Sequence, residues 1–156
     1  MSNAKMLDFE SVDAAIEFAI EKEQEAYDFY TGWSKKLDQE AIQQVFREFA
    51  VEELRHRDLL ADVKKGKREL TSDPTVRDLK ITDYFTAVKP AEDLSYQDAL
   101  QLAIQRERGS IELYNRLASS AGEPELAKLF GSLVDEETKH KMRLETIYDE
   151  NFLQEG

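Results

Sequence analysis

The sequence contains no cysteine, only three prolines and six glycines among 156 residues, and no long hydrophobic run. Without cysteine the chain forms no disulfide, iron–sulfur cluster or zinc ribbon, so any metal must be bound by oxygen and imidazole nitrogen. No stretch approaches the ~20 apolar residues of a membrane span, and no signal-peptide pattern is present. We therefore expect a cytoplasmic protein with no membrane partner.

Basic residues are also scarce, because 21 lysines and arginines face 33 aspartates and glutamates, which gives a net charge of −12. Nucleic acids and anionic membranes would be repelled by such a surface, so we expect neither as a partner. Strong helix formers dominate the remaining composition and predict an all-α protein. The length suits one domain, which we place at residues 6–154, with residues 1–5 interpreted as the remnant of an expression tag.

The chain repeats itself at one constant offset without a gap. Residues 19–23 match 103–107, and residues 46–60 match 130–144. Two copies of one helical hairpin explain this repeat most simply, and we assign them to residues 9–65 and 95–150.

Apolar residues at helical spacing predict four helices, over residues 9–36, 39–65, 95–119 and 124–150. Asp38 is the expected N-cap of the second helix, Ser95 with Asp98 resembles a capping box, and Pro124 suits a first helical turn.

A long linker, residues 66–94, joins the two hairpins. Neighbouring helices need only ~2–8 residues between them, so this linker predicts a crossover along the length of a four-helix bundle. Its segment 76–85 is predicted to form a short helix.

Six residues with ionisable side chains lie on the apolar stripes of the predicted helices: Glu23, Glu53, His56, Glu107, Glu137 and His140. The chain has only two histidines, and each follows a stripe glutamate by three residues, on the same helix face. Within each hairpin the two glutamates stand ~15 residues from the turn, or ~22 Å, and therefore at matching heights.

Two alternatives compete with a metal site, and a third concerns which glutamates would bind the metal. A single Glu-x-x-His arises often by chance, and the carboxylate of a glutamate on an apolar stripe usually reaches solvent. Glu52 and Glu136 are the alternative ligands to their neighbours Glu53 and Glu137. Four uncompensated carboxylates in one core would nevertheless cost many kcal/mol. We therefore expect four carboxylates and two imidazoles to bind two metal ions in one layer.

These residues carry a resemblance to a known family. Glu23, the segment Glu53-Leu54-Arg55-His56, Glu107 and the segment Glu137-Thr138-Lys139-His140, supported by residues 78–84, are similar to the rubrerythrin-type branch of the ferritin-like di-iron proteins. The resemblance covers nearly the whole chain and implies a ferritin-like four-helix bundle.

The resemblance also implies ligand roles. Glu53 and Glu137 would bridge two iron ions, with Glu23 and His56 completing one coordination sphere and Glu107 and His140 the other; manganese or zinc are possible occupants. Tyr30 and Tyr114 are expected either to donate hydrogen bonds to these carboxylates or to be ordinary core tyrosines.

Two departures from the family pattern affect the expected activity. Ser110 stands where rubrerythrins commonly carry an additional glutamate, which puts their redox-linked ligand exchange in question. The chain also lacks the cysteine-ligated rubredoxin domain that often delivers electrons, so the reductant must be an external electron-donor protein.

The resemblance implies a di-iron oxidoreductase, expected to be a homodimer, that reduces hydrogen peroxide during oxidative stress. The alternative is a ferroxidase or iron-storage protein of bacterioferritin type, with dioxygen as the oxidant, although cage subunits usually carry a fifth short helix. A metal-stabilised interaction module without enzymatic activity is a third possibility. Elsewhere, the basic run 64–68 is interpreted as solvated surface and Trp33 as a packing residue.

Overall fold

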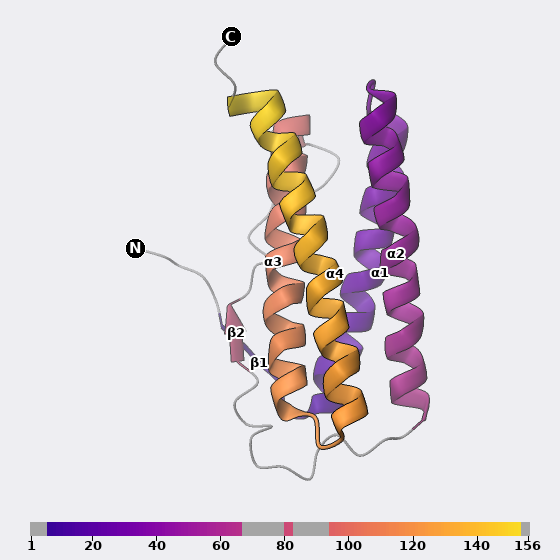
Figure 1. Ribbon diagram of the computed structural model, residues 1–156, viewed down its shortest axis with the longest axis vertical. Coiled ribbons are helices and arrows are strands. Elements are labelled where there is room, and N and C mark those ends of the chain that lie inside the picture. The colour runs from indigo at the N-terminus through magenta and orange to yellow at the C-terminus, as the bar shows by residue number, and fades with distance from the viewer. Residues whose placement is uncertain (1–5, 67–79, 83–93, 154–156) are drawn as a thin grey trace. The chain divides into compact units, whose positions relative to one another are not determined.

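The computed structural model describes residues 6–66, 80–82 and 94–153, which form four long helices and a small two-stranded ribbon (Figure 1). The chain divides into two compact units. One unit, which begins at Asp13, holds the first two helices, and the other holds the ribbon and the last two. Within the described part of the chain, no helix combines the length and hydropathy needed to cross a membrane.

The first unit is a hairpin of α1 (Val12–Lys36) and α2 (Glu40–Lys65). Tyr30 of α1 packs its ring edge-on against Phe46 and Phe49 of α2, with ring centroids 5.4 and 5.5 Å apart. An ion pair between Lys64 and Glu17 joins the two helices near their other ends. Edge-to-face aromatic contacts of this kind add to the stability gained from burying the rings.

The start of α2 corrects one prediction. The helix begins at Glu40, and its N-cap is Gln39 rather than Asp38. The backbone is still extended at Gln39, with φ −89° and ψ 116°, so Asp38 lies one residue too early to cap the helix. At the other hairpin the cap predictions are confirmed.

The second unit contains the hairpin of α3 (Tyr96–Ser120) and α4 (Pro124–Tyr148), which lie against each other along their length (Figure 1). The Asp98 backbone N–H donates a hydrogen bond of 3.1 Å to Ser95 Oγ at the N-cap of α3, and Pro124 occupies the first turn of α4. The chain continues from α4 into one turn of π-helix, η3 (Asp149–Leu153). The predicted helix boundaries therefore agree with the structure within three residues.

A short antiparallel ribbon was not predicted from the sequence. Strand β1 (Met6–Asp8) pairs with β2 (Lys80–Thr82), so that Leu7 stands opposite Ile81, and β2 lies next to α3. The predicted helix over 76–85 is therefore wrong for residues 80–82, and its remaining residues lie outside the described part of the chain. The proposed tag remnant, residues 1–5, also lies outside it.

Candidate metal centre

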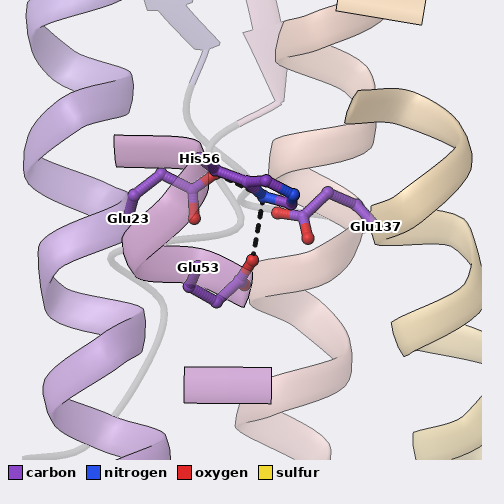
Figure 2. A group of neighbouring side chains, drawn as sticks. All are labelled: Glu23, Glu53, His56 and Glu137. Carbon is purple, nitrogen blue, oxygen red and sulfur yellow. Dashed lines mark ion pairs between the residues drawn. The ribbon is translucent and has the colours of Figure 1, made fainter. Parts of the chain in front are cut away.

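The first hairpin brings three of the predicted ligands together (Figure 2). Glu23 extends from α1, and Glu53 and His56 lie one turn apart on α2. Nδ1 of His56 is 3.3 Å from Glu23 Oε2 and 3.1 Å from Glu53 Oε1. One potential ligand atom from each of the three side chains lies within 4.8 Å of the others. We call these residues the first trio.

The second hairpin repeats this arrangement. Nδ1 of His140 on α4 is 3.3 Å from Glu107 Oε2 on α3 and 3.2 Å from Glu137 Oε1, which is one turn earlier on its own helix. We call Glu107, Glu137 and His140 the second trio. The carboxylate–imidazole distances of the two trios are nearly equal, so the repeat in the sequence is also a repeat of site geometry.

All six side chains are buried, with exposed fractions between 0 and 3%. Each trio contains two carboxylates and one imidazole, so even a protonated imidazole balances only one of two negative charges. Buried charge of this kind requires a compensating partner. A divalent cation provides it, and carboxylate oxygen with imidazole nitrogen is a donor set that suits iron, manganese or zinc. The residues present therefore fit a metal.

The structure distinguishes these glutamates from their neighbours. Glu53 and Glu137 are 2 and 0% exposed, whereas Glu52 and Glu136 are only half-buried. Among the described residues, the clusters of acidic and histidine side chains that could hold a metal ion contain only the six predicted ligands. Neither Glu52 nor Glu136 belongs to such a cluster. Sequence reasoning thus missed no carboxylate or imidazole that the described structure brings into such a cluster.

The two predicted tyrosines are both buried in their hairpins. Tyr30 and Tyr114 are 2 and 1% exposed, and the ring of Tyr30 also lies 5.4 Å from that of Phe29. These contacts fit the core interpretation, and a role beside the carboxylates stays a prediction. Trp33 is buried, as expected for a packing residue, with the Lys36 ammonium 5.0 Å from its ring centre.

Paired helices that present repeated, buried Glu/Glu-x-x-His trios are typical of helical proteins whose carboxylates bind metal. The Rubrerythrin family model matches residues 15–148. The chain belongs to this family, as the sequence predicted.

Comparison with solved structures confirms the ferritin-like four-helix fold. A Thermotoga maritima protein assigned to the ferritin-like diiron-carboxylate class has 24% identity and a TM-score of 0.72, over 90% of this chain and 95% of that one. A hypothetical protein from Pyrococcus furiosus has 23% identity and a TM-score of 0.70, over 90% and 89%. No curated protein matches the sequence. At these identities the likeness establishes the fold alone.

Proposed function

We propose that the two trios together hold two iron ions and that the protein is an oxidoreductase that reduces hydrogen peroxide. The observation that carries the proposal is the twofold occurrence of one buried trio in a chain of the rubrerythrin family. Glu53 and Glu137 would be shared by the two ions, whereas Glu23 and His56 would hold one ion only, and Glu107 and His140 would hold the other.

Bound iron would supply the redox chemistry, delivering the two electrons that, with two protons, convert one hydrogen peroxide into two waters. The side chains of the two trios would form the binding site for this reaction. The carboxylates would balance the positive charge of the ions. The imidazole Nδ1 atoms lie 3.1–3.3 Å from carboxylate oxygens, and these contacts orient the side chains that would bind the ions. Exposed fractions of at most 3% keep bulk water away from these groups.

In this proposal another protein would supply the electrons. The sequence has no cysteine for an iron–sulfur or rubredoxin-type centre. We propose a separate electron-donor protein in the cytoplasm, and a homodimer as the working assembly. Size-exclusion chromatography with light scattering tests the assembly, because a dimer of an 18.0 kDa chain is easily distinguished from a storage cage.

Anaerobic loading with Fe(II), followed by stopped-flow mixing with hydrogen peroxide or with dioxygen, tests the activity. We expect two Fe(II) per chain and faster oxidation by peroxide. A variant with His56 and His140 both changed to alanine should lose the fast phase, because each trio loses its only nitrogen ligand. Faster oxidation by dioxygen would assign the protein to the ferroxidase class instead. Unchanged iron binding by the variant would refute the site.

A further inference from the structure

A groove lies between α1 and α2, and none of its lining residues belongs to the first trio. It has a volume of about 540 Å³, and two of its lining residues, Ser34 of α1 and Ala50 of α2, have small side chains. Both are buried, at 4 and 3% exposed. The volume is within the range of ~300–1,000 Å³ typical of small-molecule sites.

The rim of the groove carries two cations and an exposed apolar side chain. Lys35 of α1 and Arg47 of α2 are exposed, and Val51 is 67% exposed. Arg47 donates to the amide oxygen of Gln44 at 2.9 Å rather than to a carboxylate. Among the described residues, neither cation forms a salt bridge, although the chain carries 33 acidic residues. The groove thus offers positive charge on a protein whose net charge is −12.

Comparison of the two repeats indicates that neither the helical hairpin nor the proposed metal ligands require the two cations on the rim of the groove. The metal ligands recur at the constant offset that relates the two hairpins, but the groove residues do not. At that offset Lys35 corresponds to Ser119, and Arg47 corresponds to Gly131. Both rim cations are therefore present in one hairpin only, whereas a purely structural feature of the hairpin would be expected in both.

The groove also reaches the neighbourhood of the first trio. Tyr27, which lines it, follows Glu23 by four residues, and Ala50 precedes Glu53 by three. Residues at these spacings are neighbours on a helix surface. A molecule bound in the groove would therefore end within one helical turn of the metal ligands, without including any of them.

We propose that this groove binds a small organic anion that carries one carboxylate or phosphate group. The anionic group lies between Lys35 and Arg47, where charge-assisted hydrogen bonds are the strongest available. The apolar part of the ligand lies on Ala50 and Val51, beside the Tyr27 ring. Because no groove residue is a metal ligand, the site is separate from the proposed peroxide chemistry.

Isothermal titration calorimetry with phenyl phosphate, benzoate and inorganic phosphate tests the proposal. The titrations are made at low ionic strength, where charge interactions are least screened, with the metal removed by chelator so that no anion binds to it. We expect one site per chain, with phenyl phosphate or benzoate binding more tightly than inorganic phosphate, because only the first two have an apolar ring that can pack on Ala50 and Val51. The same titrations on Zn(II)-loaded protein should give the same result.

Matched variants locate the binding. Lys35→Gln and Arg47→Gln should each weaken binding by about tenfold, because each removes one charged hydrogen-bond donor. Arg47→Lys should retain most of the affinity. Lys65→Gln removes the same charge from α2 outside the groove and should leave binding unchanged. Absence of saturable binding by any of the three anions, or equal weakening by Lys65→Gln, would overturn the proposal without affecting the metal centre.

Discussion

Replacing Glu23 and Glu107 together by glutamine should abolish most of the stabilisation that divalent metal gives the protein. In each trio, carboxylate oxygens of two different glutamates lie within 4.8 Å of each other. At an effective dielectric constant of ~20, two unit charges at that separation repel by about 3.5 kcal/mol. A divalent cation converts this repulsion into attraction, and glutamine removes one of the two charges that the cation needs.

The size of the expected effect follows from binding linkage. At free metal 100 times its Kd, one site stabilises the folded state by ~2.7 kcal/mol, and two sites by about twice that. For a chain of this size each kcal/mol corresponds to ~2–4 °C, so the parent should gain about 10–20 °C in Tm. If the loss of one carboxylate weakens each site by about 100-fold, the remaining gain is ~0.4 kcal/mol a site, or about 2–3 °C in all.

Thermal melts followed by circular dichroism, with chelator and with Zn(II), measure these shifts without redox chemistry. The matched control is the double variant Glu21→Gln/Asp135→Asn. It removes two exposed charges, each located two residues before a proposed ligand, and should keep the full response. If the two double variants respond to Zn(II) equally, the ions bind the acidic surface, and the buried centre does not exist.

Three further predictions concern the scaffold. Gly131→Ala should raise the free energy of unfolding by about 0.5–1 kcal/mol in chemical denaturation, because the glycine lies within α4 and an added Cβ meets nothing within 4 Å. Ser95→Ala should lower it by ~1 kcal/mol, because the Asp98 N–H loses its acceptor; Ser95→Asp should restore most of this. Burial raises the pKa of Tyr96 above 10.0, so the folded state favours the neutral phenol, and stability should decline as the pH rises past 10. Melts of Tyr96→Phe against pH should lack that decline; an identical decline in both proteins would contradict the assignment.

Much of the fold and of the ligand set was predictable because each sequence pattern occurs twice in the chain. Glu23 on an apolar stripe is weak evidence by itself, but Glu107 occupies the same place in the second copy, and both histidines follow a glutamate at the same spacing. The structure confirms that each set of three comes together within its own hairpin. Their union in one centre of six ligands stays a prediction.

What escaped sequence reasoning depends on features without a periodic signal. Strands of three residues, such as Lys80–Thr82, are too short to show an alternation of apolar and polar side chains. The segment was therefore wrongly predicted to be part of a short helix. The Asp38 cap failed because the helix start depends on backbone conformation at a single residue. The groove beside Lys35 is lined by residues of both α1 and α2, among them the small Ser34 and Ala50. The sequence alone does not show that these residues lie next to each other.

The ribbon of β1 and β2 has a consequence for how the chain is connected. β1 precedes α1 in the sequence but belongs to the unit of α3 and α4, so the first hairpin is inserted into the chain of the second unit. Pairing of Asp8 with Lys80 closes a loop that contains both helices of that hairpin. Closing so long a loop costs conformational entropy, and this free-energy cost is offset only by the contacts that form when the enclosed helices fold. If the gene were split between the codons for residues 66 and 80, each fragment would carry one strand, and the ribbon would then link two separate molecules.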